Sequence, residues 1–91
     1  MTTWFIYIIE TRHGEYYTGI TTDVDRRLKD HQEGHGAKYL RGRGPLTLIW
    51  RSFVGGKGDA LRLERRIKSW PRAKKRLLIS GRISPDGCPT R

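Results

Sequence analysis

The sequence contains a single cysteine, Cys88, and no long run of hydrophobic residues. A lone cysteine has no partner for a disulfide within the chain and excludes a metal site built from cysteines. No stretch reads as a transmembrane helix or a long amphipathic surface helix, so we expect no membrane partner. No charged and then apolar signal segment precedes the first strand-like run, so we expect a reducing, cytoplasmic compartment.

Acidic residues are also scarce. Nine of them stand against nineteen basic residues, which gives a formal net charge of +10. Such a charge repels itself unless it serves a polyanionic partner, and phosphate neutralisation supplies most of the energy of non-specific nucleic-acid binding. The charge therefore favours a nucleic-acid-binding protein. A basic surface that meets only solvent is the alternative interpretation.

The length allows one small domain with a thin core. We assign residues 1–81 to this domain and residues 82–91, rich in Pro, Gly, Ser and Arg, to a flexible basic tail. Six consecutive apolar or aromatic residues at 4–9 predict a strand that is buried on both faces and central in its sheet. Further strands are expected at 16–21, after a hairpin turn, and at 46–53.

Three helices are expected between and after these strands. Asp23 is predicted to cap a helix that ends near His31, and Asp59 to cap a second helix over 60–69. A short basic helix is expected over 73–79. The order β-β-α-β-α-α, with helices covering a small three-stranded antiparallel sheet, predicts an α+β fold.

Glu64 lies where the helical pattern calls for an apolar residue. It shares a helix face with Ala60 and Ile67, and it is the only acidic residue between Asp59 and Asp86. Burying a carboxylate is costly unless a positive group meets it. Two interpretations remain open: a partly buried salt bridge to a basic neighbour, or a carboxylate that binds a hard divalent cation in a basic cleft.

Four further polar side chains fall on predicted elements. Tyr7 and Tyr17 share one face of the sheet if the paired residue numbers of the hairpin add to an even sum, and lie on different faces otherwise. Ordinary aromatic packing is the alternative for both. Arg27 and His31 lie on one side of the first helix. Arginine is well suited to gripping phosphate. The alternative for this helix face is simple exposure to solvent.

These residues together resemble a known family. The sequence Phe5-Ile6-Tyr7 followed by Tyr17-Thr18-Gly19 is similar to the paired signature of the GIY-YIG nucleases. Residues 22–31 resemble the first-helix motif of that family, with Arg27 ten residues after Tyr17. Glu64 resembles its metal-binding glutamate. The motifs are individually short, but they occur in the family's order and spacing.

The resemblance extends over residues 4–80. Segments 34–43 and 69–78 are similar to the small standalone YhbQ-like (UPF0213) branch. Phe5 and Thr18 stand where the signature has Gly and Ile, and neither is expected to do chemistry. Some relatives carry a late Asn near the site, whereas this chain contains none.

The resemblance implies a metal-dependent endonuclease that hydrolyses DNA with one Mg²⁺ or Mn²⁺ ion and leaves a 5′-phosphate and a 3′-hydroxyl. Glu64 would hold the metal, and Tyr7 would be the general base or relay its proton. Arg27 would neutralise charge on the phosphate, while Tyr17 and His31 would orient the water or phosphate, with proton exchange at His31 left open. Free tyrosine has a pKa near ~10, so this role needs a nearby cation. Tyr7 and Glu64 must then converge around one phosphate.

The Gly-rich basic segment 34–44 is the best candidate for gripping DNA, because glycines let the backbone approach phosphates. Tyr39 either packs under its own loop or stacks on an unpaired base, a contact worth roughly 1–3 kcal/mol. Stacking would favour single-stranded or branched DNA over plain duplex. The candidate DNA contacts are His35, Lys38, Tyr39, Arg41, Arg43, Lys74 and Lys75. A non-catalytic nucleic-acid-binding module on the same fold is the alternative function.

Overall fold

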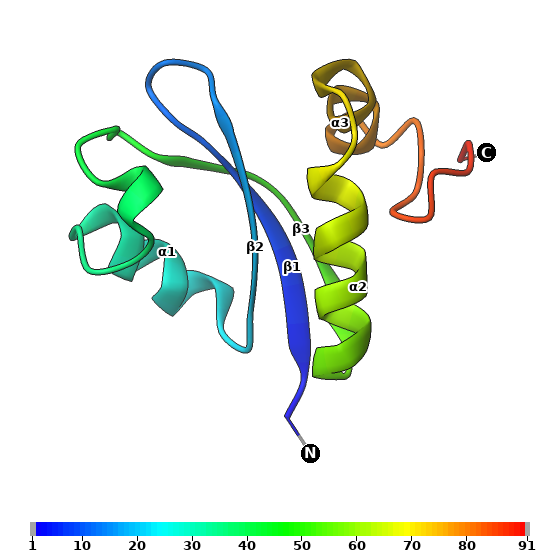
Figure 1. Cartoon of the computed structure of the whole chain (residues 1–91), viewed down its shortest axis with the longest axis horizontal. Coiled ribbons are helices and arrows are strands. Elements are labelled where there is room, and N and C mark those ends of the chain that lie inside the picture. Colours follow the sequence, from blue (N-terminus) through cyan, green and yellow to red (C-terminus); the bar gives the residue numbers. More distant parts are fainter. Residues whose placement is uncertain (1, 91) are drawn as a thin grey trace.

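The chain folds as an antiparallel sheet with helices on both faces. A computed structural model describes residues 2–90. The strands are β1 (Trp4–Glu10), β2 (Tyr16–Thr21) and β3 (Thr47–Gly55), and the helices are α1 (Val24–Gln32), α2 (Lys57–Lys68) and α3 (Arg72–Ile79). The sheet order is β2-β1-β3. The predicted α+β class, the β-β-α-β-α-α order and the central position of the first strand are confirmed (Figure 1).

Alternate residues of β1 enter two separate hydrophobic cores. Tyr7 and Ile9 point to one face, where they pack with Val24 of α1 and with Leu40 and Leu46. We call this cluster the first core. Successive side chains of a strand point to opposite faces, so the uninterrupted apolar run of β1 supplies both cores at once.

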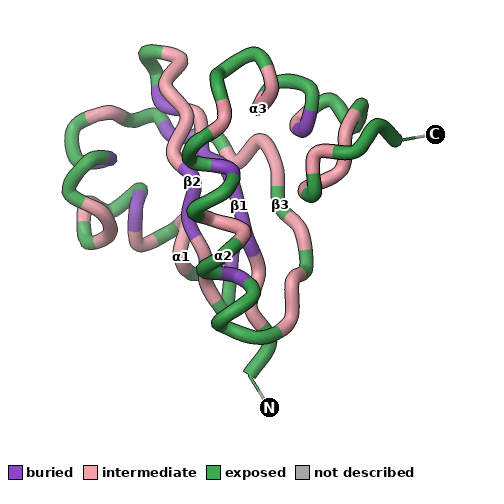
Figure 2. The backbone as a smooth tube through the Cα atoms, turned by 45° about the vertical axis from the view of Figure 1, so that its right-hand side comes forward, coloured by how far each residue is buried: buried purple, intermediate pink, exposed green. Residues whose placement is uncertain are grey.

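The second core lies on the other face of the sheet. Ile6 and Ile8 of β1 pack there with Ile67 of α2 and Leu78 of α3, and all four are almost completely buried. Figure 2 shows the buried residues concentrated along β1, with exposed residues on the outer sides of the helices. The sheet therefore separates α1 on one face from α2 and α3 on the other (Figure 1).

The first helix begins as predicted and the second does not. Asp23 caps α1, because its side chain accepts a hydrogen bond of 3.1 Å from the backbone N–H of Arg26. The prediction that Asp59 caps the second helix is wrong: α2 begins at Lys57, and Asp59 lies in its first turn. A carboxylate there still interacts favourably with the helix dipole. No helix within residues 2–90 is long and apolar enough to cross a membrane.

Residues 82–90 fold back on themselves beside the second core. Ile83 packs against that core and forms a bridge with Pro89. The backbone N–H of Thr90 donates to the carbonyl of Arg82 at 3.0 Å. The domain boundary at residue 81 and the flexibility of the tail stay predictions, and Met1 and Arg91, at the ends of the predicted ranges, lie outside the described residues.

Candidate active site

Tyr7 and Tyr17 share the first-core face of the sheet. Tyr7 pairs with Gly19 and Tyr17 pairs with Ile9, so the paired residue numbers add to an even sum. The two rings are tilted neighbours with centroids 6.4 Å apart. The prediction that an even register places both tyrosines on one face is confirmed. They are diagonal neighbours, however, and do not lie directly opposite each other.

The Tyr7 ring extends over β2 because its partner there has no side chain. A Cβ atom at Gly19 would lie 2.5 Å from Tyr7 Oη, which is closer than real Cβ contacts allow. Since β2 is an edge strand, the ring crosses the last strand on this side of the sheet. Gly19 thus gives the Tyr7 hydroxyl its path toward the sheet edge, while the ring itself remains buried in the first core.

His31, near the end of α1, meets the Tyr7 hydroxyl. Its Nε2 atom lies 2.9 Å from Tyr7 Oη, and its side chain is only 2% exposed. The Tyr17 ring contacts the His31 ring edge-on, with centroids 5.5 Å apart. The two tyrosines and the histidine therefore form one aromatic cluster where α1 packs on the hairpin. We call it the tyrosine cluster.

Arg27 lies one helical turn before His31, and its positive charge acts on the Tyr7 hydroxyl, whose pKa it lowers. The pKa of Tyr7 is raised from 10.0 to about 12, mainly by burial and also by the nearby Tyr17, while Arg27 opposes both. Burial also raises the pKa of Tyr17, again against Arg27. Burial lowers the pKa of His31, and Arg27 adds to that lowering while Asp30 opposes it. The cluster thus holds neutral aromatic groups beside one permanent cation.

Glu64 approaches from the other layer of helices. Its side chain, 20% exposed, lies on α2 between the buried Ala60 and Ile67, and its carboxylate is 3.6 Å from Lys68 Nζ. The salt bridge, one of the two sequence interpretations, is therefore present. Burial is the main cause that raises the pKa of Tyr7 and Tyr17, and the Glu64 charge raises both further.

The placement of Glu64 bears on whether one site can contain all five predicted residues. Tyr7 packs in the first core, whereas α2 covers the opposite face and contacts β2. The carboxylate is nevertheless within electrostatic range of both tyrosine hydroxyls. Tyr7, Tyr17 and His31 are thus in mutual contact, with Arg27 on the same helix as His31. Glu64 lies on the other layer, and its charge raises the pKa of both tyrosines.

A carboxylate that the sequence analysis did not single out completes the cluster on its outer side. Glu15 Oε1 accepts a hydrogen bond of 2.6 Å from Arg43 Nη1, and Glu15 Oε2 accepts one of 3.2 Å from the Tyr39 hydroxyl. The ring of Tyr39 stacks on Tyr17 at 6.1 Å, and the Arg43 guanidinium lies 4.4 Å from the centre of the Tyr39 ring. The sequence feature that could have predicted this position is spacing. Glu15 lies two residues before Tyr17, and residues two apart in an extended chain point to the same side.

The other predicted DNA contacts are divided between two faces of the molecule. His35, Lys38 and Arg41 are exposed in the segment that follows α1. Lys74 and Lys75 belong to α3, which Figure 1 shows on the opposite side of the sheet from that segment. Lys74 lies over the ring of Trp70 at 4.5 Å. The structure therefore brings Tyr39 and Arg43 to the tyrosine cluster and keeps Lys74 and Lys75 away from it.

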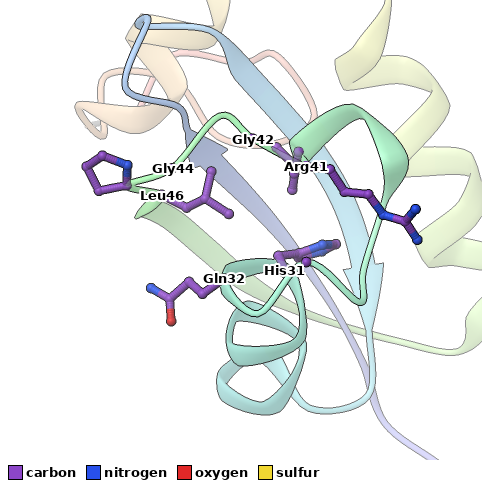
Figure 3. Close-up of a pocket in the computed structure, with 9 residues that line it drawn as sticks. His31, Gln32, Arg41, Gly42, Gly44 and Leu46 are labelled. Carbon is purple, nitrogen blue, oxygen red and sulfur yellow. The ribbon is translucent and has the colours of Figure 1, made fainter.

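A cavity of about 310 Å³ borders the cluster at His31 (Figure 3). Leu46 and Gln32 contribute to its wall, and in Figure 3 the side chain of Arg41 extends away from Leu46. Neither Tyr7 nor Glu64 lines this cavity. The hollow is thus a neighbour of the tyrosine cluster and is not the place where Tyr7 and Glu64 would converge on a phosphate.

Comparison with known proteins identifies the family. Residues 3–77 match the family described as the GIY-YIG catalytic domain. This chain belongs to the GIY-YIG family. Membership places it in a nuclease superfamily, as the paired tyrosine motifs predicted.

The GIY-YIG chain is similar in sequence to UPF0213 proteins of several bacteria. It is 54% identical over 77 residues to a UPF0213 protein of Aeromonas hydrophila. The match covers 85% of this chain and 57% of that relative, so this chain spans little more than half of the relative's length. It is 50% identical over 80 residues to the UPF0213 protein YhbQ of Escherichia coli K12, covering 88% and 80% of the two chains. The solution NMR structure of a UPF0213 protein from Bacillus halodurans has a TM-score of 0.57 and 47% identity, covering 86% and 83%. The predicted branch is confirmed.

Proposed function

We propose that this GIY-YIG chain is a metal-dependent endonuclease that hydrolyses phosphodiester bonds in DNA. The observation that carries the proposal is the environment of one hydroxyl: Tyr7 Oη lies 2.9 Å from His31 Nε2, and the charge of Arg27 lowers its pKa. A buried phenol needs one hydrogen-bond partner, and His31 already provides it. Arg27 adds a permanent positive charge, which favours the phenolate that a general base requires.

The reaction that we propose begins at the Tyr7 oxygen. Even with Arg27 beside it, the pKa of Tyr7 is about 12, mainly because of burial, so a bound cation is also needed to favour the phenolate near neutral pH. The phenolate takes a proton from a water molecule whose oxygen attacks phosphorus. The bond from phosphorus to the 3′-oxygen breaks, and that oxygen takes a proton from solvent. Arg27 neutralises charge on the phosphate oxygens, and Tyr17 orients the phosphate.

Glu64 is the side chain that would hold the divalent cation. Within residues 2–90 no group of three or more His, Cys, Asp or Glu residues is gathered, so such an ion would have few protein ligands. Mg²⁺ accepts one carboxylate and fills its other positions with water and substrate phosphate. The partly exposed Glu64 oxygens fit this pattern, because their charge already acts at both tyrosine hydroxyls. When bound, Mg²⁺ or Mn²⁺ supplies positive charge to the phosphate and lowers the pKa of water.

We further propose that the substrate is single-stranded or branched DNA. Tyr39 is 43% exposed and stacks on Tyr17, so an unpaired base that stacks near it would place its phosphate beside the tyrosine cluster. Lys38 and Arg41 offer phosphate contacts in the same segment, and Lys74 and Lys75 offer a second basic patch to a longer substrate. The lone cysteine favours a cytoplasmic setting for this activity.

A nucleic-acid-binding module without catalysis is the second candidate. The observation that favours it is the position of Glu64, which is carried on the face opposite the first core and is paired with Lys68 at 3.6 Å. A binding module, however, has no need for a cation at a buried tyrosine hydroxyl. The combination of Tyr7, Arg27 and His31 therefore supports the nuclease more strongly.

The test is incubation with labelled single-stranded, duplex and branched DNA in Mg²⁺, Mn²⁺ or a chelator. We expect cleavage only with the metal, and loss of cleavage with retained binding in Glu64→Gln. Glu33→Gln is the matched control, because Glu33 also has a lysine four residues away, Lys29 at 3.9 Å, on an exposed surface. Tight, salt-sensitive binding with no cleavage in any divalent metal would instead establish the binding module.

A further inference from the structure

Both nitrogens of the buried His31 ring have partners. Nε2 lies 2.9 Å from Tyr7 Oη, and the backbone N–H of Ala37 donates to Nδ1 at 3.2 Å. A backbone N–H can only donate, so Nδ1 must offer its lone pair and carries no hydrogen. A neutral imidazole has one N–H, and the hydrogen is therefore on Nε2. It follows that His31 donates to Tyr7 and that the Tyr7 oxygen accepts.

We propose that the Gly36–Ala37 backbone fixes His31 as the neutral Nε2–H tautomer, so that His31 donates a hydrogen bond to Tyr7 and does not remove its proton. Gly36 and Ala37 are then positioning residues that act through His31. The assignment of the tautomer rests on geometry alone. Its consequence for catalysis rests on the proposed nuclease function.

Gly36 is required because the backbone lies against the imidazole ring. A Cβ atom at position 36 would lie 2.0 Å from His31 Nδ1 and 2.7 Å from Cε1. The requirement is one of space, since Gly36 does not adopt a positive φ, unlike Gly34 and Gly42. Ala37 then packs against the first core, and its carbonyl accepts a hydrogen bond of 3.1 Å from the N–H of Leu40. These contacts hold the Ala37 N–H in a fixed direction.

The tautomer decides the route of the proton at Tyr7. The phenolate accepts a hydrogen bond from His31 Nε2–H, is stabilised by the positive charge of Arg27, and takes its proton from the attacking water. Tyr7 then returns to the phenolate by releasing that proton to solvent. His31 keeps its own hydrogen throughout, because receiving a second one on Nδ1 would set an N–H against the Ala37 N–H. His31 is thus a stabilising donor and not a proton carrier.

The tautomer is read directly from two-bond ¹H–¹⁵N spectra of the imidazole in the full chain at pH 8, with His31→Gln identifying the His31 signals. We expect the Nε2–H form in the wild type. We expect the same form in Tyr7→Phe, because the loop and not Tyr7 sets the tautomer. The Nδ1–H form, or exchange between both forms, in either protein would overturn the proposal.

Gly36→Ala tests the positioning role. We expect its His31 spectrum to lose the fixed Nε2–H form and its DNA cleavage to fall at least roughly tenfold, the scale of a misplaced catalytic group. Gly58→Ala is the control, because Gly58 lies in the first turn of α2, outside the predicted DNA contacts, and a Cβ there would be 3.7 Å from the nearest atom, the end of the Arg62 side chain. An unchanged His31 spectrum in folded Gly36→Ala would overturn the role of Gly36.

If Gly36→Ala does not fold, the wild-type and Tyr7→Phe spectra still decide the tautomer. These spectra do not depend on DNA cleavage. A chain that cuts no DNA would therefore refute the proposed nuclease function and leave the assignment of the tautomer unchanged.

Discussion

The Tyr7 hydroxyl occupies the space that a side chain at Gly19 would fill. A Cβ atom there would lie 2.5 Å from Tyr7 Oη and 2.6 Å from Cζ. Gly19 does not adopt a positive φ, so its role is to leave room and not to permit an unusual backbone. The last Gly of the paired signature is therefore explained by the first tyrosine, because the two residues are partners across the hairpin.

Gly19→Ala should destabilise the fold and stop DNA cleavage together. The added methyl group must displace the Tyr7 ring, and overpacking of this kind costs about 1–3 kcal/mol. Urea unfolding and a cleavage assay measure both effects. Gly58→Ala is the control, since a Cβ there would be 3.7 Å from the nearest atom, the end of the Arg62 side chain. Equal unfolding free energies for wild type and Gly19→Ala would contradict the packing described.

Thr18→Val should leave stability unchanged or raise it by about 1 kcal/mol. Thr18 is 3% exposed, and its hydroxyl has no hydrogen-bond partner among residues 2–90. Valine keeps the shape and removes the unpaired polar atom. The matched control is Thr11→Val, because the equally buried Thr11 hydroxyl bonds Glu15. That change should destabilise by about 1–3 kcal/mol. A larger loss in Thr18→Val than in Thr11→Val would show that the Thr18 hydroxyl is satisfied after all.

Glu15→Gln should strengthen binding to single-stranded DNA. Glu15 neutralises Arg43 and accepts from Tyr39, and the Arg43 guanidinium beside it is the main cause that lowers the pKa of Glu15. Removing the charge frees Arg43 for a phosphate, so the slope of log affinity against log salt should steepen by about 0.7. Binding measured over a salt series tests this. Glu33→Gln makes the same change in net charge away from Arg43, and equal effects of the two variants would refute a specific role for Glu15.

The Tyr7 hydroxyl should ionise well above the ordinary tyrosine value in an absorbance titration at alkaline pH. Its pKa is raised, mainly by burial, from 10.0 to about 12. The neutral form is therefore favoured in the fold, and the stability it contributes is present below pH 10 and is lost as pH rises toward 12. The difference between the absorbance titrations of wild type and Tyr7→Phe gives the curve of Tyr7 itself. A midpoint at the ordinary value would mean that the hydroxyl is not buried as described.

The sheet could be predicted from the sequence because its signals are local. The apolar run of β1 predicted that this strand is central. The two-residue period of a strand left two arrangements for Tyr7 and Tyr17, on the same face of the sheet or on different faces. The cap at Asp23 was equally local. The start of α2 was missed because Asp59 suits both a cap and a first turn, and only packing decides between them.

The parts of the site that were missed depend on contacts between distant segments. Glu15 meets Arg43 across twenty-eight residues, and Ala37 reaches back to His31 through a loop without regular structure. No periodicity encodes such contacts. Lys74 and Lys75 were predicted as DNA contacts by charge alone, and the sequence could not show that the sheet separates them from segment 34–44.

The central claim is that the Tyr7 hydroxyl, held by Arg27 and His31, performs the chemistry on DNA. Single-turnover cleavage of labelled single-stranded DNA in Mn²⁺ by Tyr7→Phe tests it most directly, with Tyr16→Phe, whose ring packs at the second core under Arg72, as control. We predict cleavage by wild type and Tyr16→Phe, and a rate lower by about 10²–10⁴ in Tyr7→Phe with DNA affinity unchanged. Cleavage by Tyr7→Phe at the wild-type rate would contradict the account.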